Sequence, residues 1–146
     1  MLSQKAKVLQ ALGGRTMLNH VKTAANKISN KISVVVGFDK EGVEEEIKKI
    51  GINANTFLQK EQIGTADAVK TTLKDIDKNK KILILYGDVP LIKEETLKKL
   101  CNQESDLSIL TTNLENPTGY GRALKDKENN VLGIIEEKDA DLEQKK

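Results

Sequence analysis

The chain has 146 residues, of which 38% are hydrophobic and 32% charged, a size and composition typical of one globular domain with its own core. The net charge of +2 and an aromatic content of 3% without tryptophan give no reason to propose nucleic acid or an anionic membrane as a partner. No run approaches the roughly 20 apolar residues that span a bilayer, and the single cysteine, Cys101, suits a reducing, cytoplasmic environment.

Helical and strand-like patterns alternate along the chain. In chain order they predict a helix over 17–28, a strand over 32–37, a helix over 43–50, a strand over 54–59, a helix over 66–76, a strand over 81–86, a helix over 97–101, and strands over 106–114 and 129–137. This alternation is typical of βαβ units. It predicts an α/β fold whose mostly parallel sheet is covered by helices on both faces.

The predicted strand over 81–86 runs into an acidic turn, Gly87-Asp88. Gly87 allows the backbone to turn tightly, and open α/β sheets bind ligands at the carboxyl ends of their strands. Asp88 is therefore well placed to hold a hard cation such as Mg²⁺ that bridges phosphates. The same aspartate could instead cap the helix that begins near Ile92. Spacing alone leaves both interpretations open.

A second candidate stretch is LQKEQIGTADA, residues 58–68. Gln59 ends a predicted strand, and its amide offers a donor and an acceptor that match the edge of a pyrimidine. Gly64 and Thr65 open the next helix, where free N–H groups and close backbone approach are available. The simpler alternative is that Gly64 forms a turn and Thr65 is the N-cap.

A third candidate is the loop ENPTGYGR, residues 115–122, which contains one proline, two glycines and a tyrosine. This composition predicts a structured loop between strands. Its backbone could approach a ligand, but chemistry alone favours a plain tight turn. The single histidine, His20, is predicted to be a partly buried helix residue, and spacing gives no reason to single out Lys7.

Four stretches taken together are more specific than any one of them: KVLQALGGRTMLNHV, QKEQIGTADAV, LYGDVPLI and PTGYGR followed by GIIEEKDA. In this order and at these separations they closely resemble the uridylyltransferase domain of the bacterial N-acetylglucosamine-1-phosphate uridylyltransferases, the bifunctional GlmU family. The resemblance covers almost the whole chain. It implies a Rossmann-like nucleotide-diphospho-sugar transferase fold and a nucleotidyltransferase activity.

The reaction implied by the resemblance joins UTP and N-acetylglucosamine 1-phosphate to give UDP-N-acetylglucosamine and pyrophosphate, a step toward peptidoglycan and lipopolysaccharide precursors. The sugar phosphate oxygen attacks the α-phosphorus in line, so catalysis is mostly positioning and charge neutralisation. By resemblance, Asp88 is the Mg²⁺ ligand and Lys7 the phosphate-contacting lysine. The implied substrate contacts are Gln59, Gly64 and Thr65 for uracil, Tyr86 and Gly87 for the nucleotide, and Gly121 and Glu136 for the amino-sugar.

The chain also departs from the family pattern. The family begins with a strand and a glycine-rich loop, L-A-A-G-x-G-T-R-M. In this chain Met1 aligns with the methionine that ends the motif, and the rest of the motif has no counterpart. Ala6 stands where the family has proline. The family's E-x-N-x-G segment and the C-terminal left-handed β-helix, which carries acetyltransferase activity and the trimer interface, have no counterpart. We therefore expect residues 1–146 to form a partial nucleotidyltransferase domain that lacks the first strand and the glycine-rich loop.

That first strand would be central in a doubly wound sheet, so its neighbours are expected either to have unpaired edges or to close up in a new register. The alternative to an active uridylyltransferase is a truncated, non-catalytic remnant with at most weak uridine-nucleotide binding.

Overall fold

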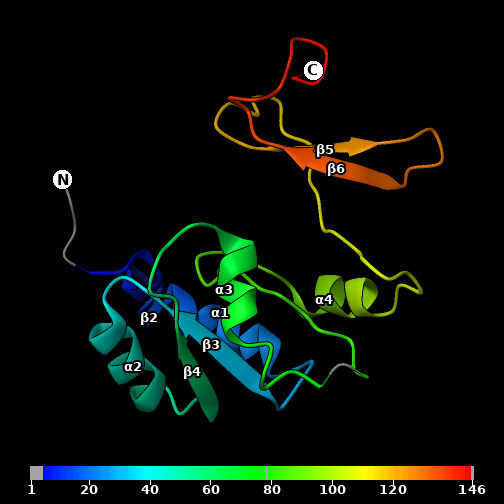
Figure 1. Cartoon of the computed structure of the whole chain (residues 1–146). Coiled ribbons are helices and arrows are strands. Elements are labelled where there is room, and N and C mark those ends of the chain that lie inside the picture. The colour runs from blue at the N-terminus through cyan, green and yellow to red at the C-terminus, as the bar shows by residue number, and fades with distance from the viewer. Residues whose placement is uncertain (1–4, 78, 146) are drawn as a thin grey trace. The chain divides into compact units, whose positions relative to one another are not determined.

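The computed structural model describes residues 5–77 and 79–145, so Met1 lies outside the described residues. The chain forms two compact units, Met1–Asn102 and Gln103–Lys146. The elements of the first unit are η1 Lys7–Leu9, β1 Ala11–Leu12, β2 Arg15–Thr16, α1 Met17–Ala25, β3 Ile32–Val36, α2 Lys40–Lys49, β4 Ala54–Leu58, α3 Thr65–Thr71 and α4 Glu94–Cys101 (Figure 1). Those of the second unit are β5 Arg122–Lys125 and β6 Val131–Ile135.

The centre of the first unit is a parallel pair of strands. β3 and β4 lie side by side in register from Ile32 opposite Ala54 to Val36 opposite Leu58, and α2 connects them (Figure 1). This β3–α2–β4 unit confirms the predicted α/β class. All four predicted helices are present as α1 to α4, although α1 and α3 end several residues before their predicted limits.

The prediction of strands over 81–86 and 106–114 is wrong for the residues that the structure describes. Both segments are free of helix but make no ladder, and Ile82, Ile84 and Tyr86 are 51%, 57% and 58% exposed. In the described ranges β3 pairs with β4 alone, and the two other ladders are antiparallel pairs. An apolar run favours an extended backbone, but a strand also needs a neighbour. The parallel part of the sheet is therefore limited to β3 and β4.

The core lies where β3, α2 and α1 meet. Val36 from β3, Val43 and Ile47 from α2, Leu18 from α1 and Ala6 ahead of η1 form one buried cluster. Burying an aliphatic side chain of this size contributes about 1.5–3 kcal/mol. The cluster therefore holds the segment that carries Lys7 against the parallel pair.

Asp39 connects this segment to α2. It is the N-cap of α2 at a left-handed φ of 55°, and its side chain accepts hydrogen bonds from the backbone N–H groups of Gly42 at 3.3 Å and Ala6 at 3.0 Å. A Cβ added at Gly42 would lie 2.5 Å from Asp39 Oδ1. Glycine at position 42 is therefore what allows the cap to close.

Replacing Gly42 by alanine is expected to destabilise the protein, although alanine is the better helix former. The gain in helix propensity is about 1 kcal/mol. The clash displaces Asp39, so the cap and the hydrogen bond to Ala6 are lost, each worth about 1 kcal/mol. Urea unfolding should show a net loss of about 1 kcal/mol.

The control for this prediction is the same change in an Asp39→Ala background. Without the Asp39 carboxylate, the alanine at position 42 has nothing to displace, and its effect should turn stabilising. A stabilising effect of Gly42→Ala in the otherwise wild-type chain would contradict the proposed closure of the cap.

Hydrogen bonds arrange the remaining parts of the first unit. His20 of α1 is half-buried, as predicted, and its Nε2 lies 2.8 Å from the carbonyl oxygen of Leu12, which holds the β1–β2 hairpin on α1. Beyond α3, the Asp75 carboxylate accepts from Asn55 at 3.1 Å and from Ser33 at 3.3 Å. The hydrogen bond from Asn55 is the main cause that lowers the pKa of Asp75. These contacts hold the segment after α3 near the first halves of β3 and β4.

The second unit is built on the antiparallel β5–β6 hairpin, in which Arg122 is opposite Ile135. Asp126 closes its turn by accepting from the backbone and side-chain nitrogens of Asn130 at 2.8 and 2.9 Å. At the open end of the hairpin, the loop over 115–121 precedes β5 and Glu136 follows β6. The predicted strand over 129–137 is thus confirmed as β6, and β5 was missed.

Candidate functional site

Lys7 and Asp88, which are 81 residues apart in sequence, lie together in the first unit. Lys7 Nζ donates to Asp88 Oδ2 at 2.9 Å. η1 carries the lysine, and the turn after residues 81–86 carries the aspartate. A Cβ on Gly87 would lie 3.0 Å from Val8 Cγ1, so the absence of a side chain at Gly87 lets the acidic turn approach η1 closely. The two predicted catalytic residues are therefore brought together.

Of the two interpretations of Asp88, the structure excludes the helix cap. α4 begins at Glu94, its N-cap is Lys93, and no side chain caps it. Asp88 lies well before this helix and does not cap it. Its side chain is 35% exposed, and that of Lys7 is 71% exposed. An exposed pair of this kind is worth at most about 1 kcal/mol, so a ligand can readily separate it.

Asp88 would supply one carboxylate to a cation. In the part of the chain that the structure describes, no group of three or more His, Cys, Asp or Glu side chains is arranged to hold a metal. Mg²⁺ is commonly bound through one or two carboxylates together with substrate phosphates and water. The site therefore fits a Mg²⁺ ion that arrives with a nucleotide, and fits poorly a metal held by protein alone.

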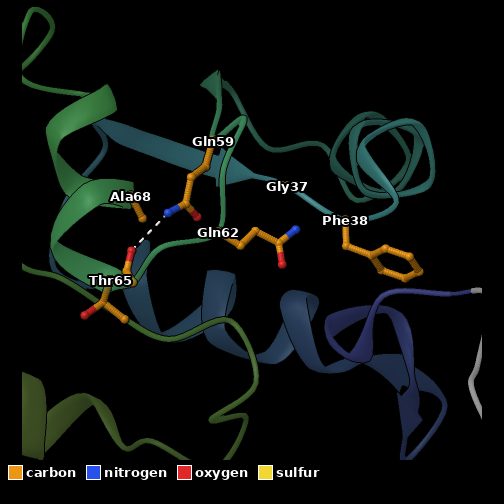
Figure 2. A pocket seen from close by; sticks show the side chains of 7 residues that line it. Gly37, Phe38, Gln59, Gln62, Thr65 and Ala68 are labelled. Carbon is orange, nitrogen blue, oxygen red and sulfur yellow. Dashed lines mark hydrogen bonds between the residues drawn. The ribbon is translucent and has the colours of Figure 1, made fainter.

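An open hollow of about 300 Å³ lies at the carboxyl ends of β3 and β4 (Figure 2). Residues after both strands and the first turn of α3 form its lining: Gly37, Phe38, Gln59, Gln62, Gly64, Thr65 and Ala68. Figure 2 shows the Gln59 side chain between the strand ends and α3, and the Gln62 side chain directed toward Gly37 and Phe38. This is the edge of the sheet at which ligands bind in open α/β folds. The three predicted uracil contacts, Gln59, Gly64 and Thr65, all line this hollow.

Hydrogen bonds orient Gln59 within the hollow. Its Nε2 donates to the carbonyl oxygen of Gly64 at 2.9 Å and to Asp67 Oδ2 at 3.1 Å. These bonds use the amide nitrogen and leave the amide oxygen to accept from a ligand. Gly64, at φ 128° and ψ 172°, is the N-cap of α3, and Thr65 is its first helical residue. The alternative in which Thr65 is the N-cap is therefore wrong, and position 64 requires glycine.

The two predicted amino-sugar contacts lie together in the second unit. A Cβ on Gly121 would lie 3.9 Å from Glu136 Oε2 and 3.3 Å from the carbonyl oxygen of Ile135. The preceding residues form a tight turn, in which Tyr120 N–H donates to Pro117 O at 3.0 Å and Gly119 has φ 84°. The loop is thus a tight turn, as chemistry alone favoured, and it also brings Gly121 next to Glu136.

Two residues around this turn, Arg122 and Glu137, were not predicted from the sequence. The side chain of Arg122 is 13% exposed, and Nη2 lies 3.6 Å from Glu137 Oε1. Glu137 also accepts the backbone N–H of Gly119. The available signal was an arginine in a glycine-rich loop followed, one hairpin later, by two adjacent glutamates.

Comparison with protein families assigns this α/β chain to a nucleotidyltransferase family. A model of the cytidylyltransferase family matches residues 4–145, and the chain belongs to that family. Its relatives include the bifunctional protein GlmU of Ruthia magnifica subsp. Calyptogena magnifica, 44% identical over 142 residues, and that of Francisella tularensis subsp. novicida, 44% identical over 143 residues. Each alignment covers 96% of this chain and 31% of the relative.

The comparisons confirm the resemblance to GlmU that the four stretches indicate. The chain spans about a third of the length of these relatives. None of the helices in residues 5–77 and 79–145 has the length and apolar content that a membrane crossing requires.

Proposed function

We propose that the chain carries the nucleotide site of a uridylyltransferase that makes UDP-N-acetylglucosamine and pyrophosphate from UTP and N-acetylglucosamine 1-phosphate. The observation that supports this proposal is the contact between Lys7 and Asp88, in which an ammonium group able to bind phosphate lies 2.9 Å from a carboxylate of the kind that Mg²⁺ prefers. The reaction would supply peptidoglycan and lipopolysaccharide precursors in the cytoplasm, where UTP is made.

In this proposal Asp88 would hold the Mg²⁺ that accompanies UTP. Lys7 exchanges its hydrogen bond to Asp88 for one to a phosphate oxygen. The metal, when bound, neutralises charge on the phosphates. The sugar phosphate oxygen then attacks the α-phosphorus in line, and pyrophosphate leaves. The protein contributes by holding the two phosphate groups in line and by balancing their charge.

Substrate recognition in this proposal is divided among three groups of residues. The hollow at the strand ends receives the uracil, which Gln59 reads with its amide while Gly64 and Thr65 contact it from the start of α3. The proposed nucleotide contacts Tyr86 and Gly87 directly precede Asp88, and Tyr86 is 58% exposed. Gly121 and Glu136 are the proposed contacts for the amino-sugar.

A second candidate function is uridine-nucleotide binding without catalysis. The observation that favours it is the state of residues 81–86, which make no ladder in the described ranges while Ile82, Ile84 and Tyr86 are more than half exposed. This segment leads directly into Asp88. A catalytic carboxylate must be held within about 0.5 Å of its productive position. A segment outside any strand ladder holds it less firmly than a sheet would.

A pyrophosphate-release assay with UTP, Mg²⁺ and N-acetylglucosamine 1-phosphate separates these candidates. Turnover that requires the sugar phosphate and disappears in Asp88→Ala supports the uridylyltransferase. Mg²⁺-dependent binding of UTP without pyrophosphate release supports the non-catalytic candidate. A chain that neither binds UTP nor releases pyrophosphate rejects both.

A further inference from the structure

The Arg122 side chain is the centre of a polar network in the second unit. Nη1 donates to the carbonyl oxygen of Pro117 at 3.1 Å and also to that of Tyr120. Nη2 lies 3.6 Å from Glu137 Oε1, and Glu137 Oε2 accepts the N–H of Gly119. One ion pair thereby holds the backbone of the 117–120 turn through its carbonyl oxygens and through an amide.

The network depends on both the charge and the shape of the Arg122 side chain. The Arg122 side chain is only 13% exposed, and its buried Nε has no hydrogen-bond partner among the described residues. Burying a guanidinium is unfavourable unless good geometry compensates for it. Its rigid planar fork reaches two carbonyl oxygens and a carboxylate together, which the single ammonium group of lysine does not reproduce. Position 122 therefore requires the guanidinium group of arginine, and the positive charge of a lysine would not be enough.

Each member of the ion pair is a sequence neighbour of a proposed amino-sugar contact. Arg122 follows Gly121, and Glu137 follows Glu136. Gly121 and Glu136 face each other closely at the open end of the β5–β6 hairpin. Because the network restrains the turn before Gly121 and the residue after Glu136, it restrains the distance between the two contacts.

We propose that Arg122 and Glu137 are positioning residues, which set the spacing between the Gly121 backbone and the Glu136 carboxylate for the N-acetylglucosamine group of the ligand. This inference rests on the proposed function for the nature of the ligand. The two residues act through the turn and need no contact with the ligand. Removing either should weaken recognition of the sugar and leave recognition of the nucleotide unchanged.

The first measurement concerns the network without any ligand. In the full chain labelled with ¹⁵N-glycine, the Gly119 amide proton should resonate downfield because it donates to a carboxylate. In Glu137→Gln this resonance should move upfield. The resonance of Gly133 in β6 should stay in place, which shows that the second unit of the variant is folded. A Gly119 resonance that does not move would overturn the network.

The second measurement is the affinity of the full chain for UDP-N-acetylglucosamine and, separately, for UTP with Mg²⁺. Glu137→Gln and Arg122→Lys should each weaken binding of the sugar nucleotide about 10-fold, the scale of losing a residue that orients a ligand-binding group. Binding of UTP should change less than about 2-fold. Glu128→Gln, the same change at an exposed carboxylate of this hairpin, should affect neither ligand.

The outcomes separate this inference from the proposed function. Wild-type affinity for UDP-N-acetylglucosamine in both variants, or an equal loss for UTP, overturns the inference alone. A wild-type chain that binds neither ligand overturns the proposed function and with it the role in sugar recognition. Selective loss of the sugar nucleotide supports both.

Discussion

Replacing Asp88 by asparagine is expected to weaken Mg²⁺-dependent binding of UTP about 100-fold. Asparagine has the same shape but no charge, so the change removes the proposed metal ligand and the partner of Lys7. Removing a residue that only orients a metal ligand typically costs about 10–100-fold in metal affinity, and removing the ligand itself is expected to reach the upper end of that range. Titration calorimetry with UTP in Mg²⁺ and in EDTA measures this effect directly.

The same substitution should hardly change stability. The Lys7–Asp88 pair is exposed, and such pairs contribute at most about 1 kcal/mol to the free energy of unfolding. Asp106→Asn, at an exposed aspartate of the second unit, is the matched control and should leave UTP binding unchanged. Equal affinity of Asp88→Asn and the wild-type chain in Mg²⁺ would contradict the metal-binding role. A loss of several kcal/mol of stability would instead assign Asp88 a structural role.

The second large effect is expected from Leu97→Ala. Leu97 is 1% exposed, and no other residue among those described is a large side chain so fully buried. It anchors α4, whose remaining surface carries charged residues such as the Glu94–Lys98 pair at 2.6 Å. Truncating a buried leucine removes its transfer free energy and leaves a cavity, which together cost about 2–5 kcal/mol. Urea unfolding should show the free energy of unfolding lowered by that amount.

A matched control tests whether burial causes this effect. Leu91→Ala removes the same atoms from a side chain that is 77% exposed, and such surface changes are usually within about 0.5 kcal/mol. If both substitutions destabilise the protein equally, Leu97 is not packed as the structure shows. If Leu97→Ala leaves the unfolding midpoint unchanged, α4 does not depend on this contact.

The helices and the extended segments that form β3 and β4 follow from local sequence. The apolar residues of α2 recur at helical spacing, and Val43 and Ile47 enter the core together, because residues three and four apart share a face. Strand β3 is a β-branched run of suitable length. The segment over 81–86 has an equally clear pattern, yet it forms no ladder. Its pairing depends on a distant neighbour, and local pattern contains no information about whether that neighbour is present.

The candidate site shows the same division. The sequence by itself determined the residue types available for phosphate, cation and base binding, and the resemblance carried by four short motifs selected among them. The spacing of residues gave no reason to choose Lys7. It left two roles open for Asp88, a helix cap and a cation ligand. Only the tertiary structure decided that Lys7 Nζ lies 2.9 Å from Asp88 Oδ2 and that α4 begins too late to be capped by it.

Arg122 and Glu137 show most clearly what only the tertiary structure decided. An arginine in a polar loop and a glutamate near a charged tail are ordinary surface residues by composition. Their role arises because β5 and β6 pair antiparallel, which returns the residue after β6 to the loop before β5. The sequence by itself determined the family, the helices and the chemical groups at hand. The fold determined which of these groups meet, because contacts between distant residues depend on strand pairing and packing that no local pattern encodes.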